Sequence, residues 1–242
     1  MPTKPKTIIV TGASQGIGAG ITRVFLDRGY RVVANSRNIA KSGAFSSDDN
    51  LALVDGDIGD PRTAKKIAET AVGKFGSIDA LVNNAGIFFT KRFTDYTVED
   101  FRSLVSTNLE GFLHITQLAI KQMLAQKTGG SIVTITAALA DNPIAGMTAS
   151  VPIITKGGLN AITQHLAIEY AREAIRVNAV APGVVATPLH GNTPDEVLKK
   201  LSPMGRVSTV AEVTEAVLYL TEAQAVTGDV LHVDGGAHRG KW

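Results

Sequence analysis

Short continuous apolar runs alternate along this chain with segments whose apolar residues recur every three or four positions. The apolar runs lie at residues 7–10, 31–35, 51–54, 80–82, 131–136, 176–180 and 230–233, and their lengths suit strands buried on both faces. Apolar residues at helical spacing follow residue 18 and recur over 61–75, 97–126, 156–170 and 211–221. Residues 38–50 are polar and are expected to form a loop that can contain a short helix. This alternation predicts one doubly wound α/β domain of the Rossmann type over residues 1–242, with a seven-stranded, mainly parallel sheet.

A glycine-rich turn joins the first apolar run to the first helix. It reads Val10-Thr11-Gly12-Ala13-Ser14-Gln15-Gly16-Ile17-Gly18. Gly12 permits a tight turn, and Gly16 and Gly18 allow the backbone to approach a pyrophosphate and the sheet closely. The helix that follows offers unpaired N–H groups to phosphate oxygens. The turn therefore indicates a dinucleotide site, although its spacing differs from G-x-G-x-x-G and a purely structural turn is the alternative.

Composition narrows the function classes. Of 242 residues, 44% are hydrophobic, the net charge is +2 and no cysteine occurs, so a large core is available while disulfides and thiolate chemistry are excluded. There is no basic stripe with interleaved aromatic residues, no signal-peptide pattern and no apolar run of roughly 18 residues. We therefore expect a cytoplasmic protein that acts on a small molecule, with no nucleic-acid or membrane partner and no metal site.

Four further motifs follow the glycine turn in order. They are Asn83-Asn84-Ala85-Gly86, then Thr107-Asn108-Leu109, then Pro182-Gly183 with Thr187-Pro188, and finally Asp234-Gly235-Gly236. Each is weak alone, but together and at these intervals they resemble the short-chain dehydrogenase/reductase family over essentially the whole chain. The Asp234-Gly235-Gly236 turn is expected to be structural and to pack near the cofactor loop.

The resemblance implies a role for each matching residue. The glycine turn, through Gly12, Ser14, Gln15, Gly16, Ile17 and Gly18, would hold the cofactor phosphates; Asp57 and Ile58 would meet the adenine; Asn84, Ala85 and Gly86 would line the adenosine ribose and pyrophosphate; and Pro182, Gly183, Val185 and Thr187 would hold the nicotinamide amide. Asn108 and Lys156 would be catalytic, and Lys156 would also bind the nicotinamide ribose. Two alternatives stay open: Asn83-Asn84 as a strand-end turn, and Lys156 as a solvated helix lysine.

The end of the second strand bears on the choice of cofactor. An acidic residue there accepts hydrogen bonds from a ribose 2′-hydroxyl, whereas an arginine pairs with a 2′-phosphate. This chain has Asn35-Ser36-Arg37 and no carboxylate, and a guanidinium matches phosphate geometry well. The sequence therefore favours NADP(H) over NAD(H); the alternative is that Arg37 merely faces solvent.

The pattern departs from the family at the catalytic serine and tyrosine. The tyrosine that precedes the lysine by four positions is replaced by Pro152, and Ala137 takes the serine position, with Thr136 the nearest hydroxyl. Pro152 suits the first turn of a helix, which Ser150 could cap. The replacement proton donors to consider are Thr148, Ser150, Thr155 and His190, of which only His190 has an ordinary pKa near neutrality.

Three functions are compatible with these residues. The first is an NADP(H)-dependent oxidoreductase for a carbonyl or alcohol substrate with a non-standard proton donor, which we favour because the cofactor residues are intact. The second is a cofactor-binding regulatory or structural subunit without redox turnover, and the third is a non-redox enzyme that uses the same pocket. Residues 188–208, which include His190 and Asn192, are expected to form the substrate lid.

Similar proteins pair through two long helices, here 97–126 and 150–170, and through the last strand, 230–233. The sequence also has more apolar residues on the first of these helices than one sheet can cover: Leu109, Leu113, Leu118, Ile120 and Met123. We therefore expect a homo-oligomer, either a tetramer or a dimer.

Overall fold

A seven-stranded sheet, parallel in every strand pair, lies at the centre of the described chain. The computed structural model describes residues 5–191 and 193–240, so both ends of the predicted domain and Asn192 of the predicted lid lie outside the described residues. The strands are β1 (Thr7–Thr11), β2 (Arg31–Ser36), β3 (Leu51–Asp55), β4 (Ala80–Asn83), β5 (Gly130–Ile135), β6 (Ile175–Pro182) and β7 (Val230–Val233). Their order is β3-β2-β1-β4-β5-β6-β7, which confirms the predicted doubly wound fold. The order reverses between β1 and β4, the point where such sheets bind ligands.

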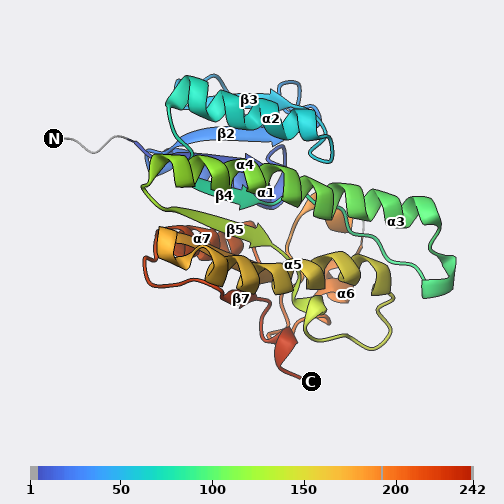
Figure 1. Cartoon of the computed structure of the whole chain (residues 1–242). Coiled ribbons are helices and arrows are strands. Elements are labelled where there is room, and N and C mark those ends of the chain that lie inside the picture. Colours follow the sequence, from blue (N-terminus) through green and yellow to red (C-terminus); the bar gives the residue numbers. More distant parts are fainter. Residues whose placement is uncertain (1–4, 192, 241–242) are drawn as a thin grey trace.

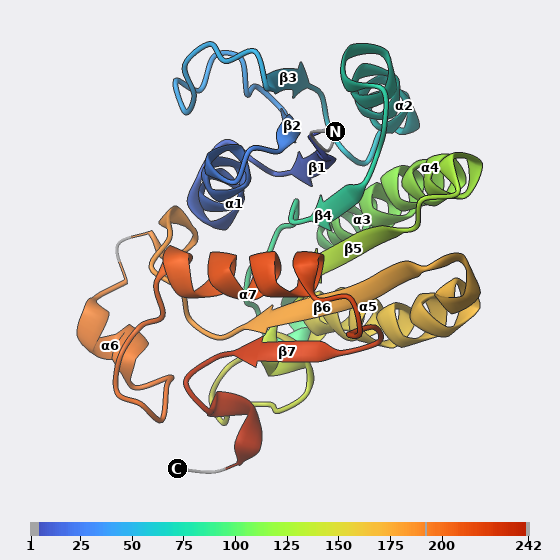
Figure 2. The same ribbon diagram turned by 90° about the vertical axis from the view of Figure 1, so that its left-hand side faces the viewer.

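Helices cover both faces of the sheet, as Figure 2 shows. On one face lie α1 (Gly16–Asp27) and α7 (Val210–Glu222), and on the other α2 (Pro61–Thr70), α4 (Gly111–Gln126) and α5 (Ser150–Glu169). Successive residues of a strand point to opposite faces, so Ile8 and Val10 belong to the α1/α7 core and Ile9 to the α2/α4 core. This explains why the strands read as continuous apolar runs.

The long helical pattern over 97–126 is interrupted by a π-helical segment. Figure 1 shows α3 (Val98–Val105) and α4 following one another in nearly the same direction. Between them lies η3 (Ser106–Glu110), whose wider turn contains Asn108. Thr97 and Asp100 form a capping box that starts α3, and π-helical turns of this kind are frequent at functional sites. The predicted helix 61–75 likewise changes to a π-helical segment, η1, at Ala71–Phe75.

The helix that carries Lys156 begins earlier than its apolar spacing predicts. It starts at Ser150, so Pro152 lies in the first turn as expected, where a missing N–H leaves no bond unmade. The prediction that Ser150 caps this helix is wrong, because Ala149 precedes the first turn and no side chain caps it. Residues 38–50 contain turns and bends but no helix.

The segment after β6 covers the carboxyl end of the sheet. It contains two short helical pieces, η6 (Pro188–His190) and α6 (Asp195–Lys199), within the predicted lid. Within residues 5–191 and 193–240, no helix is long and apolar enough to cross a bilayer. The same residues contain no group of three or more His, Asp or Glu side chains placed to hold a metal ion.

Candidate active site

A cavity of about 420 Å³ opens at the carboxyl ends of the central strands. Each residue predicted to bind the cofactor lines it: Gly12, Ser14, Gln15, Gly16, Ile17, Gly18, Asn35, Ser36, Arg37, Asp57, Ile58, Asn84, Ala85, Gly86, Lys156, Pro182, Gly183, Val185 and Thr187. Asn108, which was predicted to be catalytic, does not line this cavity. The fold thus gathers residues from segments more than 170 positions apart.

The backbone of the glycine turn lines the cavity, and a side chain at Gly12 or Gly18 would clash with neighbouring residues. Gly12 has a φ of +65°, and a Cβ there would lie 2.8 Å from the Cα of Ala85. A Cβ on Gly18 would lie 2.3 Å from the carbonyl oxygen of Gly12. Helix α1 begins at Gly16 without a side-chain cap, so its first N–H groups remain available to an anion at the cavity wall. This geometry fits a dinucleotide pyrophosphate.

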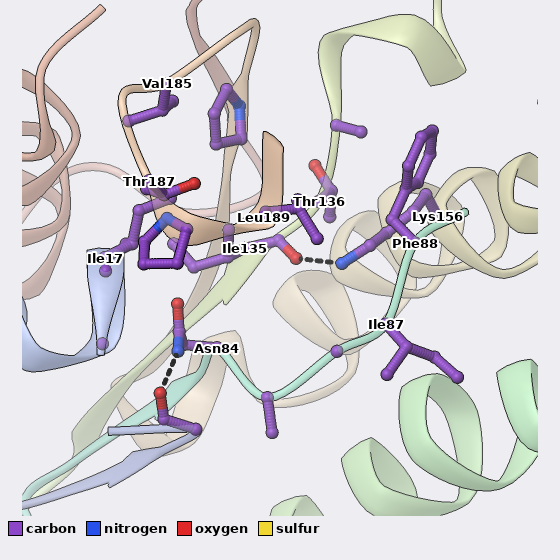
Figure 3. Close-up of a pocket in the computed structure, with 18 of the residues that line it drawn as sticks. Ile17, Asn84, Ile87, Phe88, Ile135, Thr136, Lys156, Val185, Thr187 and Leu189 are labelled. Atoms are coloured by element: carbon purple, nitrogen blue, oxygen red, sulfur yellow. Dashed lines mark hydrogen bonds between the residues drawn. The ribbon is translucent and has the colours of Figure 1, made fainter. Parts of the chain in front are cut away.

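Asn84 fixes the glycine turn to the end of β4. Its Nδ2 donates to the carbonyl oxygens of Thr11, at 2.9 Å, and Gly12, at 3.0 Å. In return, the Thr11 hydroxyl accepts hydrogen bonds from the backbone N–H groups of Asn84 and Ala85. Figure 3 shows the Asn84 amide directed at this turn. The observed contacts of Asn84 therefore shape the cradle, while its neighbours Ala85 and Gly86 offer backbone to the cavity.

The end of β2 presents one exposed cation to the cavity. The Asn35 side chain is buried and donates to the carbonyl oxygens of Val54 and Gly56, so it ties β2 to β3. Ser36 and Arg37 follow at the cavity wall. Within the described residues, the Arg37 guanidinium forms no hydrogen bond or ion pair, and it is exposed. It is therefore available to a phosphate.

Lys156 lies at the other end of the cavity. Its side chain comes from α5, and Nζ donates to the carbonyl oxygen of Ile135 at 2.8 Å (Figure 3). The residue is only 7% exposed, so the alternative of a solvated helix lysine is wrong. Burial away from water disfavours the charged form and lowers the pKa of the Lys156 amine to about 8.

The end of the cavity that contains Lys156 has few side-chain proton donors. Ala137 and Thr136 line the cavity, and the Thr136 hydroxyl donates to the carbonyl oxygen of Val180 at 3.3 Å. Pro152 is buried and is not among the residues that line the cavity. Of the four predicted replacement donors, only His190 lines it, and burial lowers the pKa of His190.

Asn108 lies behind the cavity wall, where its side chain hydrogen-bonds both to the loop after β4 and to α5. Its Oδ1 accepts from the backbone N–H of Ile87, and its Nδ2 donates to the Ile87 carbonyl oxygen and to the Thr155 hydroxyl, all within 3.0 Å. Thr155 in turn donates to the Pro152 carbonyl oxygen. These bonds join the strand β4 loop to the first turns of α5, and Asn108 faces a separate small cavity. The structure thus places Asn108 where it holds the loop after β4 beside the first turns of α5.

The Asp234-Gly235-Gly236 turn has the structural role that the sequence predicts. The Asp234 carboxylate is buried and accepts from the backbone N–H groups of Gly236 and His238. A Cβ on Gly183 would lie 2.9 Å from the Cα of Asp234. The turn therefore packs directly against the loop after β6.

Sequence reasoning missed the apolar wall of the cavity. This wall comes from loops: Ile87, Phe88, Ala138, Leu139, Ile144, Met147, Leu189, Leu201 and Ala237. Single apolar residues in loops carry no periodic signal, so only the lid segment around Leu189 and Leu201 was anticipated.

Comparison with known proteins agrees with this geometry. A family model described as enoyl-(acyl carrier protein) reductase matches residues 12–238. The chain belongs to the short-chain dehydrogenase/reductase family. Its relatives include the 3-oxoacyl-[acyl-carrier-protein] reductase of Bos taurus, 36% identical over 234 residues, which covers 96% of this chain and 97% of the relative. Carbonyl reductase family member 4 of Xenopus tropicalis is 35% identical, with the same two coverages.

Solved structures of this family superpose closely on the chain. ElxO with NADP bound has a TM-score of 0.89 and 29% identity, and 3-ketoacyl-(acyl-carrier-protein) reductase from Brucella melitensis, complexed with NADH, has a TM-score of 0.90 and 30% identity. Both comparisons cover 96% of this chain and 98% of the other. The family therefore includes members with either nicotinamide cofactor bound.

Proposed function

We propose that this short-chain dehydrogenase/reductase is an NADP(H)-dependent oxidoreductase that interconverts a carbonyl compound and its alcohol with a proton donor other than tyrosine. The observation that carries the proposal is the continuity of the cavity. The uncapped glycine turn and the exposed Arg37 lie at one end, and the buried Lys156 lies at the other. Oxidoreductase relatives with similar sequences support the reaction class.

Each part of the cofactor has residues that would hold it. The N–H groups at Gly16, Ile17 and Gly18 would bind the pyrophosphate, and Arg37 with Ser36 would bind the 2′-phosphate. The nicotinamide end would lie against the loop that follows β6, with its ribose at Lys156; this set is Pro182, Gly183, Val185 and Thr187. The bound nicotinamide supplies or accepts a hydride, and the protein supplies orientation and the proton.

The preference for NADP(H) rests on Arg37 rather than on the comparisons. ElxO is described with NADP and the Brucella melitensis enzyme with NADH, so family membership leaves the choice open. An exposed guanidinium with no described partner favours the extra phosphate.

The apolar wall indicates the kind of substrate. Phe88, Leu139, Met147 and Leu201 line the same cavity as Lys156. Such a wall stabilises an apolar substituent next to the reacting carbonyl. We therefore expect carbonyl compounds with an apolar body to be better substrates than small charged ones.

The decisive experiment combines binding and turnover. NADPH and NADH affinities are measured by calorimetry, and NADPH consumption is then followed against a panel of apolar and polar carbonyl compounds. Turnover with NADPH is the expected result. Tight NADPH binding without turnover would favour a cofactor-binding subunit, and product formation without nicotinamide oxidation would favour a non-redox enzyme.

The outer surfaces of three helices support the proposed homo-oligomer. Exposed apolar side chains occur on α3 at Val98 and Phe101, on α4 at Leu113, and on α5 at Ile154 and Ile168. Ile120 and Met123 were counted among the apolar residues beyond what one sheet can cover, but both are buried against the sheet. We expect sedimentation at micromolar concentration to show a tetramer or dimer; a monomer would contradict the proposal.

A further inference from the structure

Lys156 is a buried cation without an acidic partner. It is 7% exposed, and its amine has one hydrogen bond among the described residues, to the Ile135 carbonyl oxygen. An ammonium group carries three donors, so two remain for other groups. No carboxylate within residues 5–191 and 193–240 forms an ion pair with it, whereas a buried charge is normally paired.

The charged side chains on the elements around α5 have other partners or are exposed. Those with partners are Asp141, bonded to His232 and Asn160; Asp100, bonded to Lys91; and Arg176, bonded to the Leu220 and Thr221 carbonyl oxygens. Those exposed to solvent are Glu99, Arg102, Glu110, Arg172 and Glu173. The other ionisable side chains that line the cavity are Arg37, Asp57 and His190, and none of them is hydrogen-bonded to Lys156. Burial therefore controls the protonation of this amine.

The hydroxyl groups near Lys156 are already engaged. Thr136 donates to the Val180 carbonyl oxygen, and Thr155 donates to the Pro152 carbonyl oxygen and accepts from Asn108. The positions of the family's phenol and serine hydroxyl hold Pro152 and Ala137, which carry neither group. A carbonyl oxygen at this end of the cavity thus meets the Lys156 amine as its available proton source.

We propose that Lys156 itself is the general acid of the reaction, donating a proton from Nζ directly to the substrate oxygen. This inference rests on the proposed function. The carbonyl carbon receives a hydride from the reduced nicotinamide, which is oxidised, and the carbonyl oxygen receives the proton of Nζ. The product is an alcohol, and the neutral amine regains its proton from water. The reverse reaction uses the neutral amine as the base.

The protonation ranges of the two candidate groups agree with this assignment. The pKa of Lys156 is about 8, so at pH 7 the amine is mostly protonated yet acidic enough to transfer its proton efficiently. Burial lowers the pKa of His190 from its ordinary value of 6.5, so at pH 7 that imidazole is mostly neutral.

The first test separates proton transfer from cofactor binding. Lys156→Arg keeps a cation that does not release its proton, and Lys156→Met keeps much of the side-chain volume. Each should lower kcat for carbonyl reduction by about 100-fold or more, while the arginine variant retains NADPH binding by calorimetry. The exposed Lys66→Arg, on α2, is the matched control and should keep the parent rate. Wild-type reduction should also fall as pH rises through about 8, and that step should be missing in Lys156→Arg.

The second test needs no cofactor and no turnover. The apo protein, with its lysines labelled at ¹³Cε, is titrated by NMR, and the Lys156 signal is assigned by its loss in Lys156→Arg. A midpoint near pH 8 is expected, against about 10.4 for an unperturbed lysine. A midpoint above pH 10 would overturn the inference.

The third test probes the acid role by chemical rescue. Small primary amines are added to Lys156→Ala, and the rescued rate should depend on the pKa of the amine. Rescue that is absent, or insensitive to amine pKa, would contradict proton donation. Turnover by the wild type that persists in Lys156→Arg would overturn this inference alone, whereas no turnover by the wild type on any carbonyl would overturn it together with the proposed function.

Discussion

One end of the cavity is lined mainly by backbone atoms, and the other end is lined mainly by side chains. At the end that is proposed to hold the cofactor phosphates, here called the phosphate end, the backbone of the glycine turn and the N–H groups at the start of α1 make the surface. At the catalytic end, side chains make it: Lys156, Thr136, Ala137 and the Phe88 ring. The first end has the glycine turn that resembles the family's, and at the second end the sequence predicts Ala137 and Pro152 in place of the family's serine and tyrosine.

Phosphate binding by backbone groups and proton transfer by a side chain depend on residue identity to different degrees. A backbone cradle requires only that glycine be kept where a Cβ would clash, so it is specified by sterics. Proton transfer requires one group with a suitable pKa at one place, so the identity of one or two side chains decides which group can perform it. Pro152 satisfies the first turn of α5 as a helix residue while it removes a proton donor. The fold therefore accepts a residue that cannot donate a proton, and the proposed reaction then depends on another donor, Lys156.

Restoring the missing hydroxyls should change the catalytic end most. We expect Pro152→Tyr with Ala137→Ser to raise kcat for NADPH-dependent carbonyl reduction, because a phenol and a serine hydroxyl would add proton donors beside Lys156. The gain should stay below the 10²–10⁴-fold that a sole general acid contributes, since the Lys156 amine already supplies one. Pro152→Phe with Ala137→Ser is the matched control, since it lacks only the phenolic oxygen. Equal rates for the two variants, with NADPH affinity unchanged, would show that this end has been reshaped for another task.

A single carbon should disable the phosphate end. Gly18→Ala places a Cβ 2.3 Å from the Gly12 carbonyl oxygen, so the turn must shift. We expect NADPH affinity to fall, because the N–H groups of the turn move with it, and the free energy of unfolding to fall by about 1–3 kcal/mol. Gly73→Ala, at an open position with no atom within 4 Å, should leave binding unchanged. Calorimetry and urea unfolding measure both effects.

Arg37 should distinguish the two cofactors. Removing one charge-assisted phosphate contact costs about 1.5–3 kcal/mol, so Arg37→Ala should weaken NADPH binding by that amount and NADH binding much less. Arg172→Ala, which removes an exposed cation elsewhere, should change neither. Equal losses for both cofactors would show that Arg37 faces solvent rather than the 2′-phosphate.

The buried amine should make stability depend on pH. Because the pKa of Lys156 falls from 10.5 to about 8 on folding, the unfolded chain binds more protons between these values, and stability rises with pH there. Relative to Lys156→Met, the wild-type free energy of unfolding should increase by about 2 kcal/mol between pH 7 and pH 9.5. Urea unfolding of both proteins at the two pH values checks this; parallel pH profiles would contradict a lowered pKa.

Local patterns were sufficient for the phosphate end. The apolar run before Gly12 and the helical spacing after Gly18 predicted the strand, the turn and the helix, and parallel strands bring their carboxyl ends to one edge. Asn84 and Arg37 could be placed at the cavity for the same reason. Asn108 could not, because its hydrogen bonds reach Ile87, 21 positions away, and Thr155, 47 positions away.

The sequence by itself determined the order of the elements, the glycine cradle, the absent carboxylate after β2, and the presence of Ala137 and Pro152, which have no proton to donate. These features depend on residue identity and near neighbours. Only the tertiary structure decided that Lys156 is buried without an acidic partner, that Asn108 supports a loop, and that Ile120 and Met123 belong to the core. The burial and the pKa of a side chain depend on which distant segments exclude water from it. The local spacing of residues in the sequence does not predict these contacts.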